Sequence, residues 1–162
     1  MKLTLLQGFL ALLITAVAGC SSKPPASPPR PPPPTHIIAE IKATADLNLD
    51  PSGRPSPVVI RLYELKTPSA FGSADFFSLY EKDSAVLGAD LLGQEEIIVK
   101  PGDEQLIERT LNEKTQYVGF LAAYRDLDHA VWRSIVSVIP HLITPIKVDL
   151  RRTAIEVRVE SF

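Results

Sequence analysis

Alternation of apolar and polar side chains marks the chain from His36 onward. Between residues 37 and 49 every second residue is Ile, Ala or Leu, and most of the residues between them are polar or charged. Residues 155–159 alternate in the same way, with Ile, Val and Val separated by Glu and Arg. Side chains two residues apart lie on the same face of a β-strand, so this period predicts strands that each bury one face.

Further strands are predicted by short segments rich in β-branched and aromatic residues, with turn signals between them. These segments are residues 58–65, 95–99, 105–111, 117–124, 131–138 and 146–150. Proline and glycine interrupt the pattern at 50–57 and 100–103. Segment 117–124 is nearly all apolar, which predicts a central strand covered on both faces. The chain is therefore predicted to be all-β, a two-sheet antiparallel β-sandwich, with a six-stranded barrel as the alternative.

One helical segment interrupts the strands. Ser73 can cap a helix over residues 74–81, in which Phe76, Phe77 and Tyr80 are expected to share the side that lies on a sheet. Asp83 or Ser84 could cap a further short turn that ends at Leu87.

The N-terminus has the composition of a secretory signal. A lysine precedes an apolar run over residues 3–17, and Val17-Ala18-Gly19-Cys20 follows. These four residues resemble the bacterial lipobox, in which the cysteine is lipidated and becomes the mature N-terminus. We therefore predict a signal peptide at 1–19 and a lipid on Cys20, with a plain signal peptide as the alternative. The residues after Cys20 include no adjacent aspartate, which resembles lipoproteins sent to the outer membrane.

A proline-rich segment separates Cys20 from the predicted strands. Eight prolines lie between Ser21 and Thr35. Such a run favours polyproline II and cannot build a packed core. We predict that residues 20–35 form a tether that can hold the domain about 40 Å from its lipid, at roughly 3.1 Å per residue. The β-sandwich domain is then predicted to occupy residues 36–162.

The chain offers few groups for catalysis. Its net charge of −2 is not the strongly positive charge that is typical of nucleic-acid-binding proteins. With one cysteine it can form no internal disulfide. The best polar cluster is Asp126, Asp128 and His129, which could hold a cation but also fits a solvated connection. We therefore expect no enzyme activity, no metal and no cofactor apart from the lipid.

One connection between strands is long for a hairpin and is stiffened by two prolines. It runs from Leu47 to Ser56 and includes Arg54, a cation suited to a charge-assisted hydrogen bond with a partner. A stiff loop loses less entropy when it binds. An ordinary surface loop is the alternative interpretation.

Several motifs in this order resemble the TssJ family, the outer-membrane lipoproteins of the bacterial type VI secretion system. The motifs are the lipobox, Asn48 with the Pro51–Pro57 stretch, the strand at 58–65, Phe71, residues 74–80, 87–92 and 101–102, and 119–126 with Trp132-Arg133 behind it. The resemblance implies a transthyretin-like β-sandwich with a small helical addition and no catalysis.

The resemblance also implies a partner and a contact site. Members of the family are anchored beneath the outer membrane and bind the periplasmic C-terminal domain of TssM, within a complex that includes TssL. The loop between their first two strands makes the main contact. In this chain that loop supplies Asn48, Asp50, Pro51, Ser52, Gly53, Arg54, Pro55 and Ser56. We expect Asp50, Ser52, Gly53 and Arg54 to touch TssM, and Pro51 and Pro55 to hold the loop's shape.

Two other classes of function stay open at this point. The first is a periplasmic lipoprotein that binds a carbohydrate or peptide in a groove lined by residues 117–132. The second is a hydrolase with a site near Asp126, Asp128 and His129. A β-sandwich does not decide between these classes, because one fold hosts many functions.

Overall fold

Two four-stranded sheets form the framework of residues 30–160, the part of the chain that the computed structural model describes. The predicted signal peptide, Cys20 and residues 20–29 of the predicted tether lie outside the described residues. The strands are β1 (His36–Ala43), β2 (Val58–Leu65), β3 (Leu91–Val99), β4 (Glu104–Thr110), β5 (Tyr117–Ala122), β6 (Arg133–Ser137), β7 (Ile143–Leu150) and β8 (Ile155–Val159). The helical elements are α1 (Ser69–Ser73), α2 (Phe76–Leu87), η1 (Gly88–Asp90) and η2 (Leu127–His129).

The two sheets confirm the predicted β-sandwich. One sheet has the strand order β4-β1-β7-β8 and the other β3-β2-β5-β6. Neighbouring strands are antiparallel except for β1 and β7, which run parallel. The parallel pair was not predicted, because it joins the first strand to a segment about a hundred residues later and leaves no local pattern in the sequence.

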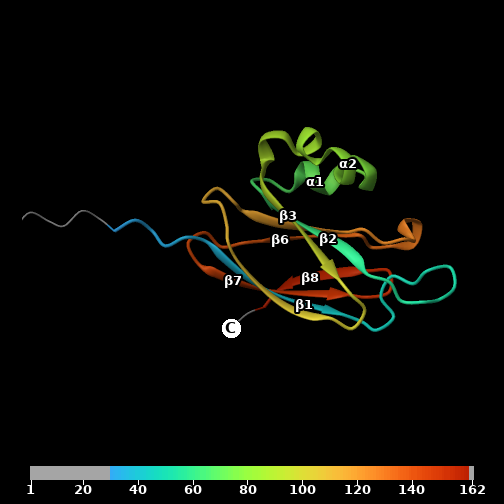
Figure 1. Ribbon diagram of the computed structural model, residues 1–162. Coiled ribbons are helices and arrows are strands. Elements are labelled where there is room, and N and C mark those ends of the chain that lie inside the picture. Colours follow the sequence, from blue (N-terminus) through green and yellow to red (C-terminus); the bar gives the residue numbers. More distant parts are fainter. Residues whose placement is uncertain (1–29, 161–162) are drawn as a thin grey trace, which may run out of the picture. The chain divides into compact units, whose positions relative to one another are not determined.

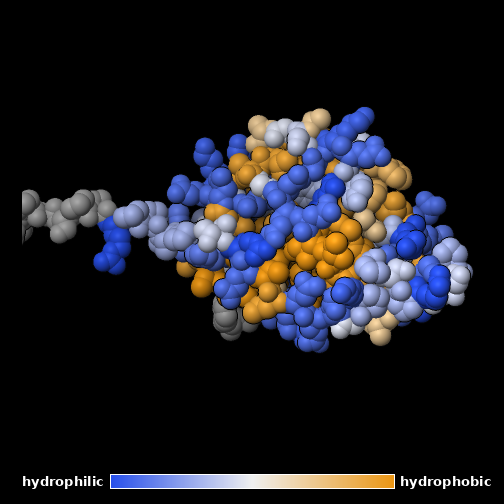
Figure 2. Space-filling model, viewed as in Figure 1, coloured by the Kyte–Doolittle hydropathy of each residue, from blue (hydrophilic) through white to orange (hydrophobic). Residues whose placement is uncertain are grey.

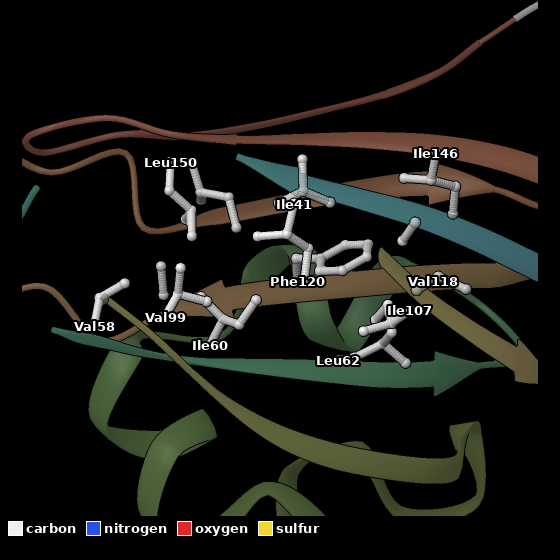
Figure 3. Packing of buried hydrophobic residues seen from close by; sticks show 14 of the residues in the cluster. Ile41, Val58, Ile60, Leu62, Val99, Ile107, Val118, Phe120, Ile146 and Leu150 are labelled. Atoms are coloured by element: carbon white, nitrogen blue, oxygen red, sulfur yellow. The ribbon is translucent and has the colours of Figure 1, made fainter. Parts of the chain in front are cut away.

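The main core lies between the sheets and follows the period of two. In β1 the side chains of Ile37, Ala39 and Ile41 are fully buried, whereas the residues between them are only half-buried. Figure 3 shows labelled side chains of the two sheets pointing toward one another, among them Ile41 of β1 and Phe120 of β5. Burying each large aliphatic side chain contributes roughly 1.5–3 kcal/mol.

A second apolar cluster lies between β5 and the helices, which cover the outer face of the sheet that contains β2 and β5 (Figure 1). Leu121 of β5 points into this cluster, together with Phe71 of α1 and Leu79 of α2. Gly119 lets α1 approach, because a Cβ at this position would lie only 3.0 Å from the ring of Phe71. Strand β5 is thus buried on both faces, as its apolar sequence predicted.

The helical segment differs from the prediction in the residue that caps it and in the side chains that it buries. Helix α2 is capped by Asp75, whose side chain accepts a hydrogen bond from the N–H of Ser78, and Ser73 instead ends the separate helix α1. Non-helical backbone at Lys82 divides α2, and Leu87 ends the second part, where a further turn was predicted. Phe77 is 61% exposed, so it does not share the buried side with Phe76. Adjacent residues of a helix point about 100° apart, so residues three or four positions apart share a face and neighbours such as Phe76 and Phe77 do not.

Strand ends also differ from the prediction. β1 ends at Ala43, because a turn at Thr44–Asn48 places Asn48 at a φ of 48°. The apolar alternation continues through this turn, and Leu47 still reaches the core. β3 and β7 begin earlier than predicted, at Leu91 and Ile143. The strand predicted at 155–159 is confirmed.

Candidate functional site

Four connections between strands gather at one end of the sandwich. β1 and β7 are parallel and therefore finish at the same end, and β5 is antiparallel to β2, so it finishes where β2 begins. The β1–β2, β5–β6 and β7–β8 connections consequently meet there, along with the β3–β4 turn. The chain enters β1 at the opposite end (Figure 1). Figure 2 shows mostly hydrophilic residues over the end that holds these connections.

The carboxylate of Asp50 organises the β1–β2 loop. Oδ1 accepts hydrogen bonds from the backbone N–H of Ser52 at 2.8 Å and of Arg54 at 2.9 Å. Oδ2 accepts from Nε of Arg54 at 2.8 Å and pairs with its Nη2 at 2.8 Å. The backbone N–H of Arg54 is the main cause that holds the pKa of Asp50 below its ordinary value, and the Arg54 side chain and the N–H of Ser52 add to it. The loop is therefore held together by its own charged groups.

Backbone bonds close the same loop into a tight turn. The N–H of Gly53 donates to the carbonyl of Asp50, and the N–H of Asp50 donates to the carbonyl of Arg54, both at 2.8 Å. Gly53 has a φ of 77°, in the left-handed region that glycine tolerates without cost. The rings of Pro51 and Pro55 fix φ at two further positions. The exposed tip has few ways to relax.

Asn48 fastens the base of the loop to two other connections. Its backbone N–H donates to the carbonyl of Arg152 at 3.1 Å, after β7. Its side-chain Oδ1 accepts from the N–H of Arg125 at 2.9 Å, after β5, and its Nδ2 donates to the carbonyl of Pro57 at 2.8 Å. Asn48 is only 4% exposed. Through its backbone and its side chain, this one buried residue ties three connections into a single surface.

The predicted contact residues divide into two groups. Pro51, Ser52, Gly53, Arg54 and Pro55 are exposed and form the tip of the loop. By contrast, Asn48 and Ser56 are buried, and the Asp50 side chain is 14% exposed. Arg54 was expected to offer its guanidinium to a partner, but that group is paired with Asp50. The contact of these residues with a partner stays a prediction.

A cleft beside the loop was missed by the sequence reasoning. It has a volume of about 440 Å³ and lies between the β1–β2, β5–β6 and β7–β8 connections. Its lining residues are Asn48, Leu49, Asp50, Pro51, Tyr124, Arg125, Asp126, Arg152 and Thr153. Arg125 and Asp126 follow a predicted strand, but only the parallel pairing of β1 and β7 reveals that Arg152 lies beside them.

The polar cluster at Asp126, Asp128 and His129 is a surface feature. Nδ1 of His129 lies 2.8 Å from Oδ1 of Asp126, and this hydrogen bond is the main cause that raises the pKa of His129. Both side chains are mostly exposed. Within residues 30–160, no three His, Cys, Asp or Glu side chains lie together in a way that could hold a metal ion.

Trp132, at the end of the segment 117–132 that the ligand-binding alternative places in a groove, packs against other side chains. Trp132 meets Phe76 edge to face, with ring centroids 5.4 Å apart, and the guanidinium of Arg133 lies 4.7 Å from the centroid of the Trp132 ring. Trp132 therefore helps to hold α2 on the sheet.

Comparison with known proteins decides the family. Residues 35–159 match the model of a family described as "Type VI secretion lipoprotein, VasD, EvfM, TssJ". The T6SS lipoprotein TssJ1 from Pseudomonas aeruginosa is 41% identical, and the match covers 80% of this chain and 99% of that chain, with a TM-score of 0.77. The chain belongs to the TssJ family. The resemblance seen in its motifs is thereby confirmed.

More distantly similar structures share the fold. Serratia marcescens Lip, described as a membrane bound component of the type VI secretion system, is 22% identical over 78% of this chain and 97% of its own, with a TM-score of 0.69. A chain in the structure described as "T6SS protein TssM C-terminal domain" from EAEC is 23% identical over 75% of this chain and 99% of its own, with a TM-score of 0.64. A search of curated proteins found no match.

Neither α-helix between residues 30 and 160 of this TssJ-family chain is long and apolar enough to cross a membrane. The match to the family begins at Thr35, next to the first strand, and ends at Val159, the last residue of β8. The loop and the cleft thus both belong to the part of the chain that the family shares.

Proposed function

We propose that this TssJ-family lipoprotein is a non-catalytic anchor of the type VI secretion complex. In this proposal acyl chains on Cys20 hold it in the outer membrane, and the sandwich faces the periplasm. There it binds the periplasmic C-terminal domain of TssM, within a complex that includes TssL. The β1–β2 loop is the contact site.

The internal hydrogen bonding of the exposed loop is the observation that carries this proposal. A loop that already has one shape loses little conformational entropy on binding, so more of the contact energy appears as affinity. In this chain Asp50, Gly53 and Asn48 fix that shape without any partner. Such a surface suits stoichiometric recognition of another protein.

The position of the loop supports the same function. The chain enters β1 at one end of the sandwich and the loop leaves the other, so the eight residues of β1 separate them by roughly 26 Å at 3.3 Å per residue. The loop therefore lies at the end of the sandwich opposite the point where the predicted tether joins β1. Confinement at a membrane also raises the effective concentration of the loop for a partner that spans the periplasm.

TssM is chosen as the partner on two grounds. The family resemblance implies it, and a chain with this fold occurs in a structure described by the name of the TssM C-terminal domain. Within residues 30–160 the groups that could have suggested a hydrolase, Asp126 and His129, form an exposed pair on the surface.

Calorimetry of the full chain in detergent with the periplasmic domain of the matching TssM tests the proposal. In the decisive variant, residues 50–55 are replaced by a glycine–serine segment of the same length, while Asn48 and Ser56 are kept. We expect this variant to lose binding by at least about 100-fold, since both the contacts and the fixed shape disappear.

The matched control replaces Glu113-Lys114, in the exposed β4–β5 turn at the other end, with Gly-Ser. It should bind as the unmodified chain does. Undiminished binding by the loop variant would move the contact to another face, and no binding by the unmodified chain would overturn the proposed partner.

A further inference from the structure

Of the charged side chains that line the cleft, all but one have a bonding partner within the described residues. Four charged side chains line it, and three of them have partners within the domain. Asp50 pairs with Arg54 at 2.8 Å, and Arg152 donates from Nε to Oδ2 of Asp46 at 3.1 Å. Asp126 bonds to His129 at 2.8 Å. The fourth is Arg125.

The side chain of Arg125 is exposed and makes no hydrogen bond or ion pair with any residue from 30 to 160 that the structure describes. Its position is nevertheless fixed, because its backbone N–H donates to Oδ1 of the buried Asn48. Its charge helps to lower the pKa of Asp50, although the two side chains do not pair. Arg125 thus contributes a positive charge that has no ion-pair partner among the described residues, from a backbone that Asn48 holds in place.

Tyr124 lies next to Arg125 and also lines the cleft. The residue is 4% exposed, and its hydroxyl has no hydrogen-bond partner among the described residues. Burial raises the pKa of Tyr124, so the phenol stays neutral and adds no negative charge to oppose that of Arg125.

We propose that this cleft receives an acidic side chain of TssM, whose carboxylate pairs with the guanidinium of Arg125. A carboxylate accepts hydrogen bonds and matches the paired N–H groups of arginine, which explains the choice of ligand group. The inference rests on the proposed function and adds a second point of contact, beside the loop tip. In this proposal the arginine that pairs with the partner is Arg125. Arg54, which the sequence suggested for that role, is already paired with Asp50.

The test compares two arginines at the same end of the domain. Arg125→Glu reverses the charge inside the cleft, whereas Arg151→Glu makes the same change one residue before the lining residue Arg152, at a side chain that is 57% exposed and outside the cleft. Binding of the full-length variants in detergent to the TssM periplasmic domain is measured by calorimetry at two salt concentrations. Thermal melts check that both variants are folded.

We expect Arg125→Glu to weaken binding by about 100-fold or more and Arg125→Ala by about tenfold, as for charge pairs at other protein interfaces. Arg151→Glu should change it by less than about threefold. The loss in Arg125→Ala should shrink at high salt, because salt screens the pair in the unmodified complex.

Equal affinities for Arg125→Glu and Arg151→Glu, with normal binding by the unmodified chain, would overturn the carboxylate proposal and leave the proposed function intact. If the unmodified chain does not bind TssM at all, the proposed function fails and this inference fails with it. Restored binding between Arg125→Glu and a TssM variant with one acidic residue changed to lysine would identify the partner residue.

Discussion

At the scale of single residues, a few buried polar groups decide what the surface can do. The side chain of Asn48 bonds Pro57 in its own loop and Arg125 in the β5–β6 connection, so its contribution to binding is indirect. Tyr124 is the opposite case, because its buried hydroxyl is unpaired within the described residues. A buried donor without a partner costs roughly 1–3 kcal/mol relative to its hydrated state. The hydroxyl of Tyr124 therefore does not contribute to the stability of the free domain.

Removing that hydroxyl should stabilise the free domain. We expect Tyr124→Phe to raise the free energy of unfolding at pH 7 by about 1 kcal/mol, measured by urea denaturation, because the unpaired group disappears while the ring stays. Tyr117→Phe, at a half-buried tyrosine, should change it by less than about 0.5 kcal/mol. A destabilised Tyr124→Phe variant would show that the hydroxyl has a partner in solution.

Because of Tyr124 we also expect the folded domain to lose stability at alkaline pH. Burial raises the pKa of Tyr124, and also that of Tyr63, above the ordinary value of 10.0. Above about pH 10 the unfolded chain therefore releases phenolic protons that the folded chain retains, so the free energy of unfolding falls as the pH rises. Urea denaturation at pH 9 and pH 11 should show this fall, and it should be shallower in Tyr124→Phe. An equal fall in both proteins would contradict the assignment to Tyr124.

At the scale of elements, the strands could be predicted from the sequence better than the connections. The period of two located the start of β1 and the whole of β8, because apolar side chains occupy alternate residues of these strands. The pattern misled at the end of β1, where the residues of the turn keep the alternation and Leu47 is buried for a different reason. Likewise, Asp75 instead of Ser73 caps α2, since two suitable caps stand close together and tertiary packing selects one.

The candidate site shows the same limit. The exposed loop could be found from its prolines and glycine, but the pairing of Arg54 with Asp50 depends on how the loop folds. The cleft could not be predicted, because Arg125 and Arg152 come together only through the unpredicted parallel pairing of β1 with β7.

Asp50 can be tested as the organiser of the loop. In Asp50→Ala the N–H groups of Ser52 and Arg54 lose their acceptor, so their amide hydrogens should exchange about tenfold faster or more, measured by NMR. TssM binding should weaken as the loop loses its fixed shape. In the control Asp103→Ala, the carboxylate that accepts from Lys100 N–H is removed, and only the β3–β4 turn should loosen. Unchanged exchange at Ser52 and Arg54 would show that the backbone bonds suffice.

At the scale of the whole molecule, the proposed function assigns anchoring and partner recognition to different parts of the chain. The lipid on Cys20 is proposed to anchor it, and the end of the sandwich with the β1–β2 loop is proposed to bind the partner. Replacing the cysteine should therefore affect only one of the two functions. We expect Cys20→Ser to remove the chain from the outer-membrane fraction and to abolish secretion, since no lipid can be attached.

The purified Cys20→Ser chain should still bind the TssM periplasmic domain by calorimetry. Ser22→Ala, two residues away, should keep both the membrane fraction and secretion. Normal secretion by the Cys20→Ser strain would contradict the anchoring role.

The arrangement of β1 also determines how the domain carries force. The strand receives the chain at one end, leads to the loop at the other, and is paired along its length with β4 on one side and β7 on the other. In the proposed arrangement, tension between the lipid and a partner bound to the loop passes along the covalent backbone of β1. The ladders with β4 and β7 hold this strand in the sheet along its whole length. The load between anchor and partner is thus carried first by peptide bonds, and the rest of the sandwich is spared most of it.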